Sequence, residues 1–171
     1  MAETTLKDYW IPSFDALYDA YFYELASDHI IETWYWIDLA LSLLTAVMVL
    51  ASAVIGWELW TKPNGKIAWG CFAVTAFALT IFHRLLSVPS RIRKEGERRQ
   101  VFSMLRVELQ NFRSGLPQSS NVSQANKRFD LLQDRLRSGI AKTPQDIVFT
   151  ERARRTVQVM VNEKLRKLIN G

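Results

Sequence analysis

Few side chains of the kinds that carry enzyme chemistry occur in this sequence, and they are scattered. The two histidines, His29 and His83, fall in different predicted helices and share no metal-ligand spacing with other residues. No Walker or dinucleotide-binding glycine motif is present. The single cysteine, Cys71, excludes an intrachain disulfide framework and a cysteine-rich zinc site. We therefore expect no enzymatic activity, no cofactor and no metal, and we interpret both histidines as packing residues at an interface.

Charge is a stronger signal, and it is divided between the two ends of the chain. Residues 1–38 contain 8 acidic side chains against one lysine, whereas residues 83–171 contain 19 basic side chains against 8 acidic ones. The basic cluster is formed by five residues: Arg91, Arg93, Lys94, Arg98 and Arg99. It could bind anionic lipid headgroups, pair with the acidic amino-terminal region of the same or a neighbouring subunit, or hold a phosphate. We favour headgroups, and we expect no nucleic acid partner because no aromatic residues are interleaved with these charges.

Two apolar segments, 37–57 and 67–88, must position these charges. The first contains about 19 consecutive residues without a charge, which is the length of helix that crosses a bilayer core. The second is long enough to cross the bilayer if it continues through Arg84 to Val88, because the charged group of Arg84 can extend to the interface while its aliphatic part stays in lipid. Tryptophans flank the first segment on both sides, as they do at membrane surfaces. We predict a transmembrane hairpin with a turn at Pro63, Asn64 and Gly65. A buried hairpin in a soluble domain is disfavoured, because so short a chain could not cover two helices that are apolar all round.

The few polar or small residues of the hairpin are the candidates for a site within the membrane. Asp38 opens the first span and Arg84 closes the second at the same level, which predicts an ion pair near the interface. Small and hydroxyl residues could pack helices closely or line a wet path after assembly, and packing is the commoner use. They are Ser42, Thr45, Ser52 and Gly56 in the first span, and Gly70, Ala73 and Thr80 in the second.

The orientation follows from the basic cluster, which comes directly after the second span. Lys and Arg near a span end are retained in the cytoplasm, so we predict that both termini are cytoplasmic. The first long apolar stretch begins too late for a cleavable signal peptide. The expected location is the inner membrane of a bacterium.

The remaining sequence predicts helices on both sides of the hairpin, so the expected fold is an all-α membrane protein. Residues 1–36 contain an acidic, aromatic amphipathic helix over 11–31, whose apolar residues are Phe14, Leu17, Tyr18, Tyr21 and Leu25. Residues 89–171 form a basic cytoplasmic helical bundle. In it, a helix extends the second span over 91–113 and stops at Gly115, and its apolar positions are Phe102, Leu105 and Leu109. A second helix carries Phe129, Leu132 and Leu136 and ends at Gly139. A third begins at Thr143 and Pro144 and runs to Ile169, with Val157, Met160, Val161, Leu165 and Leu168 on one side.

Three stretches together resemble the SLATT-domain family of two-span bacterial membrane proteins. They are Trp34-Tyr35-Trp36-Ile37-Asp38-Leu39-Ala40-Leu41, the exit Gly56-Trp57-Glu58-Leu59-Trp60, and Pro89-Ser90-Arg91-Ile92-Arg93 at the start of a long helix. The resemblance covers about residues 30–168 and is architectural, without a catalytic signature. It implies an effector of antiviral conflict systems that assembles and permeabilises the inner membrane. It also implies a nucleotide second-messenger synthase or sensor as a partner.

Three functions follow as expectations. The first is an oligomeric pore-forming effector in the lipid bilayer. The second is a non-conducting membrane anchor or scaffold that recruits a cytoplasmic partner. The third is a small housekeeping channel subunit.

Overall fold

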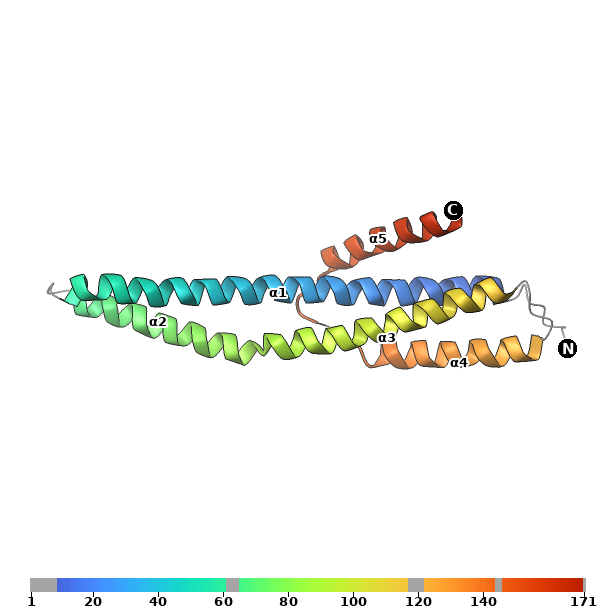
Figure 1. The fold of residues 1–171 in the computed structure, drawn as a ribbon, viewed down its shortest axis with the longest axis horizontal. Coiled ribbons are helices and arrows are strands. Elements are labelled where there is room, and N and C mark those ends of the chain that lie inside the picture. The colour runs from blue at the N-terminus through green and yellow to red at the C-terminus, as the bar shows by residue number, and fades with distance from the viewer. Residues whose placement is uncertain (1–8, 61–64, 117–121, 144–145, 171) are drawn as a thin grey trace. The chain divides into compact units, whose positions relative to one another are not determined.

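The protein is all-helical over the part of the chain that its computed structural model describes, which is residues 9–60, 65–116, 122–143 and 146–170, without the side chains of 55–60 and 169–170. These residues contain no strand. Figure 1 shows the helices in chain order: α1 (Trp10–Trp60), α2 (Gly65–Leu86), α3 (Val88–Gly115), α4 (Val122–Ala141) and α5 (Glu151–Asn170).

The chain divides into two compact units. One consists of Met1–Ile31 together with Lys94–Gly171, and we call it the helical unit. The other is Glu32–Arg93, which we call the two-helix unit. Residues 1–31 of the predicted amino-terminal segment and residues 94–171 of the predicted carboxyl-terminal region thus belong to the helical unit. The two-helix unit contains the predicted spans 37–57 and 67–88 together with residues 32–36 and 89–93.

The amino-terminal helix and the first apolar segment form one continuous helix, α1, instead of the two separate elements predicted. The segment between them, from Glu32 to Asp38, marked a boundary in hydropathy only, because an acidic residue stands at each of its ends. The segment includes no glycine or proline, the residues that end or kink a helix, so the backbone hydrogen bonds continue through it.

The core of the helical unit is built from α1, α3, α4 and α5. The predicted apolar positions Phe102 and Leu109 of α3 are buried, and so are the three predicted positions of α4. In α5 the fully buried residues are Val157 and Val161, whereas Met160, which was predicted beside them, is exposed. Two ring stacks join the helices: Tyr23 with Phe102, and Phe112 with Phe129. The helices of the predicted carboxyl-terminal region therefore pack against one another and against the first part of α1.

The buried face of α1 is wider than the predicted aromatic stripe. Leu17 and Tyr21 are buried as predicted, but Ser13, Ala16 and Ala20 are buried beside them. Such small side chains contribute little to a hydropathy pattern, yet they allow neighbouring helices to approach closely. Sequence periodicity therefore found the large residues of this face and missed the small ones.

Gly139 does not end α4 as predicted, because the helix continues to Ala141. A Cβ atom at this position would lie 3.3 Å from the Cε1 and Cζ atoms of Phe102. The glycine thus makes room for a ring of α3 and is not a helix terminator.

The last helix begins later than predicted. Thr143 belongs to the end of α4, since its hydroxyl donates to the Gly139 carbonyl at 3.0 Å. The capping residue of α5 is Thr150, whose Oγ1 accepts a hydrogen bond from the Ala153 amide at 3.4 Å. Pro144, the other residue of the predicted start, lies outside the described residues.

The predicted continuous helix from the second apolar segment into 91–113 is interrupted at Ser87. This residue has a φ of 49°, the only positive φ outside glycine in the described chain, and it separates α2 from α3. The break is closed by local hydrogen bonds, because the amides of Ser90 and Arg91 donate to the Ser87 carbonyl at 3.0 and 3.2 Å. Pro89 in the first turn of α3 needs no amide donor there.

We expect Ser87→Gly to stabilise the two-helix unit by about 0.5–1 kcal/mol, because the left-handed conformation costs an L-residue energy that glycine does not pay. The matched control is Ser90→Gly, which places glycine inside α3 and should destabilise it by about 1 kcal/mol. Denaturant unfolding in detergent micelles measures both changes. If both glycine substitutions destabilise the protein, the left-handed conformation of Ser87 does not cost the energy that we infer.

Candidate functional site

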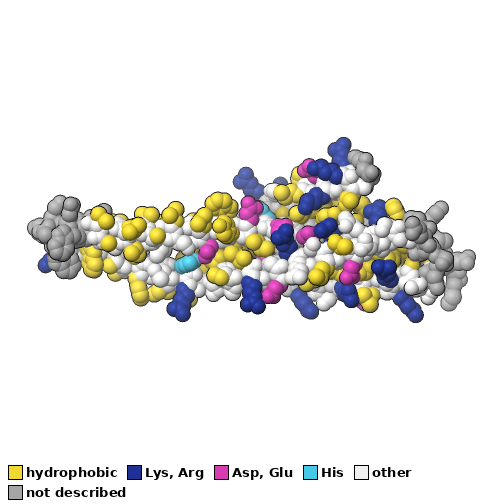
Figure 2. All heavy atoms as spheres, viewed as in Figure 1, with side chains coloured by type: hydrophobic (Ala, Val, Ile, Leu, Met, Phe, Trp, Pro, Cys, Tyr) yellow, Lys and Arg dark blue, Asp and Glu magenta, His cyan; other side chains and the backbone are white. Residues whose placement is uncertain are grey.

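The surface of the two-helix unit is mostly apolar. Two helices of the described chain are long and apolar enough to cross a membrane. The most apolar 18-residue window of the first has no buried residue, and that of the second is 6% buried. Hydrophobic side chains cover most of this unit on the face drawn in Figure 2. A core helix of a soluble protein would be covered by the rest of its own chain, which is not the case here.

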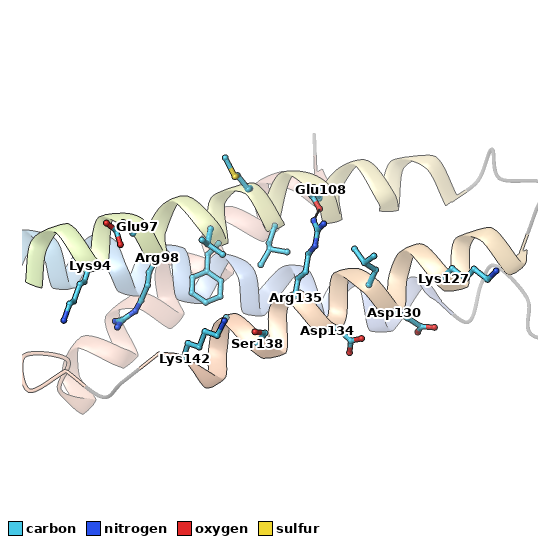
Figure 3. A pocket seen from close by; sticks show the side chains of 16 residues that line it. Lys94, Glu97, Arg98, Glu108, Lys127, Asp130, Asp134, Arg135, Ser138 and Lys142 are labelled. Atoms are coloured by element: carbon cyan, nitrogen blue, oxygen red, sulfur yellow. Dashed lines mark hydrogen bonds and ion pairs between the residues drawn. The ribbon is translucent and has the colours of Figure 1, made fainter.

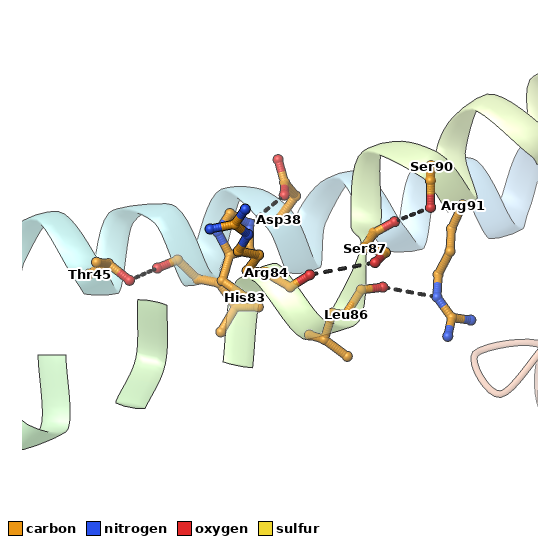
Figure 4. Close-up of polar contacts among 9 residues, drawn as sticks. Asp38, Thr45, His83, Arg84, Leu86, Ser87, Ser90 and Arg91 are labelled. Carbon is orange, nitrogen blue, oxygen red and sulfur yellow. Dashed lines mark hydrogen bonds and ion pairs between the residues drawn. The ribbon is translucent and has the colours of Figure 1, made fainter. Parts of the chain in front are cut away.

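Asp38 contacts His83, and not Arg84 as predicted. The Asp38 Oδ1 and His83 Nε2 atoms are 2.7 Å apart, and each side chain is about one-third exposed (Figure 4). Successive residues of a helix point about 100° apart, so only one of these two neighbours can face α1. Imidazole nitrogens can donate to a carboxylate, and the tautomer of the ring decides which nitrogen does so. Hydropathy predicted the turn of α2 that lies beside Asp38, but which residue of that turn makes the contact depends on how the two helices pack.

The predicted small and hydroxyl residues differ in their burial. Thr45, Ser52 and Ala73 are half-buried, whereas Ser42 and Thr80 are exposed. A Cβ atom added at Gly70 would have no neighbour within 4 Å, so that glycine permits no close contact within the chain. The side-chain surroundings of Gly56 lie outside the described residues. The set therefore divides between a face turned into the unit and positions turned outward.

Three of the predicted hydroxyl groups donate to carbonyls of their own helices. Thr45 donates to the Leu41 carbonyl at 2.8 Å, Ser52 to Val49 at 2.8 Å, and Thr80 to Ala76 at 2.9 Å. Such bonds hide the polar hydrogen and leave the span compatible with lipid. The helices can therefore lie in a bilayer before any assembly.

The basic cluster is divided among several partners. Arg99 Nε lies 2.7 Å from Asp28 Oδ1 in α1, and Arg98 forms an ion pair with Glu95. The guanidinium of Arg91 lies 4.8 Å from the centre of the Trp34 ring, and its Nε donates to the Leu86 carbonyl at 3.1 Å. The side chains of Arg93 and Lys94 are exposed. Pairing with the acidic helix, one of the three interpretations, thus applies to Arg99.

Two further contacts that the sequence did not reveal join α1 to α3. Arg106 Nε lies 2.6 Å from Glu24 Oε2, and its guanidinium lies 5.1 Å from the centre of the Tyr21 ring. Burial acts to lower the pKa of Arg106, but the hydrogen bond and the charge of Glu24 outweigh it, so that this pKa is raised. Arg113 stacks on Trp10 at 4.3 Å, and burial lowers its pKa. Partners more than 80 residues apart leave no local pattern in the sequence.

A groove of about 1020 Å³ lies between α3 and α4 of the helical unit (Figure 3). Its apolar lining includes the exposed side chains of Val101, Met104 and Leu131. Charged residues of both signs line it as well, and Arg135 and Glu108 pair across it at 3.2 Å. An apolar floor with a charged rim is the form of surface that takes an amphipathic helix.

A second cavity, of about 530 Å³, contains a buried carboxylate. Glu95 is only 4% exposed, and its Oε2 atom accepts no hydrogen bond from the described residues. Burial raises the pKa of Glu95, while the charge and hydrogen bond of Arg98 act against that rise. The nearby Asp146 adds to it. No sequence pattern distinguished this glutamate from its exposed neighbour Glu97.

The raised pKa of Glu95 predicts a specific pH dependence. The carboxyl group of Glu95 holds its proton more tightly in the folded state than in the unfolded state. The stability that this group contributes is therefore complete below the pKa of the unfolded state and is lost as the pH rises through the pKa of the folded state. We expect Glu95→Gln to remove this loss, with a melting temperature at pH 8 no lower than that of the wild type. Glu97→Gln should leave the profile unchanged. A profile that is the same in all three proteins would contradict the prediction. Melting curves between pH 4 and pH 8 measure it.

Comparisons with protein-family models, curated proteins and solved structures find no match to this chain. The likeness to SLATT-domain proteins therefore rests on the residues quoted above. The function has to be argued from the geometry of the two units.

Proposed function

We propose that this chain is an effector of the bacterial inner membrane that oligomerises and permeabilises it. In this proposal the segments 37–57 and 67–88 are the spans, and both termini lie in the cytoplasm. The observation that carries the proposal is the unburied apolar surface of the two-helix unit, because in water such a surface would need a cover that the described chain does not supply.

Assembly is required because two helices cannot enclose a path for ions. Lipid provides no hydrophobic drive between helices, so association depends on close packing of small residues. Gly70 is half-buried, but a Cβ atom there would have open space around it, so this position and the exposed Thr80 suit contacts between subunits. The half-buried Thr45 and Ser52 suit contacts within one subunit.

We further propose that the trigger belongs to a nucleotide-signalled antiphage defence system. The support for this part is the likeness to SLATT-domain proteins, which implies a second-messenger synthase or sensor as a partner. The helical unit, with its groove and its cavity, is the part of the chain that could receive such a partner or signal.

The alternative with a specific observation in its favour is a non-conducting anchor or scaffold. The groove between α3 and α4 could hold an amphipathic helix of a cytoplasmic partner without any conduction. A small housekeeping channel subunit is a third function compatible with two spans.

Expression in bacterial cells separates the three functions. The effector predicts growth arrest and entry of an otherwise excluded dye, the scaffold predicts neither, and the housekeeping channel predicts solute flux without toxicity. A reporter that is active only outside the cytoplasm should work when inserted at Asn64 and stay silent at either terminus. Reporter activity at the carboxyl end would overturn the orientation. Normal oligomers that never conduct in liposomes, under any trigger including cyclic nucleotides, would overturn the pore.

A further inference from the structure

A third cavity of the helical unit lies where the beginning of α1, the end of α3 and the end of α5 meet. Its volume of about 550 Å³ is in the range of sites for small molecules. Most of its wall is apolar and consists of two aromatic rings and three leucines: Trp10, Phe14, Leu17, Leu165 and Leu168. Among the described residues that line it, Arg113 is the only charged one. The cavity therefore offers a single positive charge within an apolar wall.

Arg113 has no counter-ion in the part of the chain that the structure describes. Arg98 and Arg106, the other half-buried arginines of α3 in the helical unit, each form an ion pair with a glutamate. Burial lowers the pKa of Arg113, and no neighbouring carboxylate opposes that effect. An anion bound beside Arg113 would therefore supply the charge that the fold provides for the other two arginines.

The rings beside Arg113 leave its hydrogen-bond donors available. The guanidinium Cζ atom lies 4.3 Å from the centre of the Trp10 ring and 4.8 Å from the centre of the Phe14 ring. Such contacts use the positive charge of the group and do not supply acceptors in the way that a carboxylate does. A guanidinium has five N–H donors, and those of Arg113 have no acceptor among the described residues. Solvent or a ligand must satisfy them.

The donors and the charge together favour a carboxylate. A guanidinium presents parallel N–H groups that match two oxygens of a carboxylate or a phosphate. A phosphate monoester carries about two negative charges at pH 7, whereas a carboxylate carries one. The one positive charge of the lining therefore balances a carboxylate and not a phosphate monoester. The apolar wall suits an apolar body attached to that group.

We propose that this cavity binds a small organic monocarboxylate on an aromatic or aliphatic body, whose two oxygens accept hydrogen bonds from the Arg113 guanidinium. The apolar body would lie against the aromatic rings of α1 and the leucines of α5. A bound ligand would thus contact α1, α3 and α5 at once. The inference goes beyond the proposed function, because it concerns the helical unit whether or not the protein conducts.

The test measures binding of 3-phenylpropionate to the full chain in micelles of an uncharged detergent. Titration calorimetry gives the affinity, after the heat of titration into empty micelles is subtracted. The control ligand is 3-phenylpropionamide, which has nearly the same shape without the charge. We expect saturable binding of the carboxylate with a Kd below about 10 mM, and at least tenfold weaker binding of the amide. No saturation by the carboxylate, or equal binding of the two ligands, would overturn the proposal. Tighter binding of phenethyl phosphate would overturn the choice of a carboxylate.

Substitutions of arginine test which group holds the ligand. Arg113→Met keeps an apolar side chain of similar length, and it should weaken carboxylate binding at least tenfold. This variant should fold, because no described carboxylate loses a partner. Arg113→Lys keeps the charge without the parallel N–H groups, so its affinity should also fall. Arg137→Met, at an exposed position of α4 outside this cavity, is the matched control and should bind like the wild type.

A substitution that leaves Arg113 in place tests the cavity itself. Leu168→Trp puts a larger ring into the wall formed by α5, where Leu168 is half-exposed, and it should weaken carboxylate binding at least tenfold. Circular dichroism shows whether each variant is folded. Wild-type affinity in Arg113→Met, or in a folded Leu168→Trp variant, would overturn the assignment of the site. Wild-type affinity in Arg113→Lys would overturn the contact with two oxygens.

Discussion

Replacing Arg106 with methionine is expected to destabilise the helical unit by about 2–4 kcal/mol. The side chains of Arg106 and Glu24 are only 23% and 13% exposed, and Arg106 also lies over the Tyr21 ring. The methionine would leave the carboxylate of Glu24 largely buried without a donor, and breaking a fully buried ion pair costs about 3–5 kcal/mol. Denaturant unfolding of the full chain in micelles, with hydrogen exchange at the amides of α3, measures the loss.

Two controls separate the pair from other effects. Glu24→Leu combined with Arg106→Met removes both charges, and it should recover most of the lost stability. Arg99→Met breaks the pair with Asp28, whose side chains are 53% and 38% exposed, and it should cost less than about 1 kcal/mol. Equal losses from Arg99→Met and Arg106→Met would show that burial of the pair does not set its energy.

The predicted elements were confirmed where a local pattern carried the information. The apolar periodicity of α3 and α4 identified Phe102, Leu109 and Leu132 as core residues, and the described structure buries all three. The position of Gly115 at the end of α3 was also predicted correctly. Periods of three and four residues are a property of the helix itself, so a single sequence is sufficient to reveal them.

The errors have a common physical cause, which is that a residue type has several uses. Gly139 can end a helix or admit a neighbouring ring, and only the position of Phe102 decides between them. Serine rarely adopts a positive φ, so nothing in the sequence marked Ser87 as the break before α3. The partner of Asp38 depends on the rotation of α2 about its own axis, which hydropathy does not define.

Two features of the helical unit that could bind a ligand or a partner were invisible to sequence reasoning for another reason. The cavity at Glu95 and the groove at Met104 are formed by elements that meet only after folding. Glutamate is usually exposed and methionine is often buried, so nothing in the sequence indicated that Glu95 is buried and Met104 exposed.

The largest effect on assembly is expected from a bulky residue at a small position of the second span that has open space at its Cβ atom. Gly70→Leu should leave the single subunit intact, because a Cβ atom at this position has no neighbour within 4 Å in the chain. In an oligomer the same leucine would prevent the close approach of two helices. Each lost contact is worth about 0.6–2 kcal/mol, and it recurs at every interface of the assembly. We expect at least tenfold less crosslinked oligomer and a corresponding loss of dye entry, with insertion unchanged.

The effect should depend on position and not on hydrophobicity. Thr80→Leu is a second test, because Thr80 is exposed and its hydroxyl is satisfied by the Ala76 carbonyl, so its removal leaves no unpaired group. Val74→Leu is the matched control, since this residue is already large and is 68% exposed. It should assemble and permeabilise like the wild type. If Gly70→Leu and Thr80→Leu both form normal oligomers, the subunits meet through another surface, and the groove of the helical unit becomes the next candidate. If oligomers are lost while dye still enters, permeabilisation does not require assembly, and the proposed mechanism is wrong.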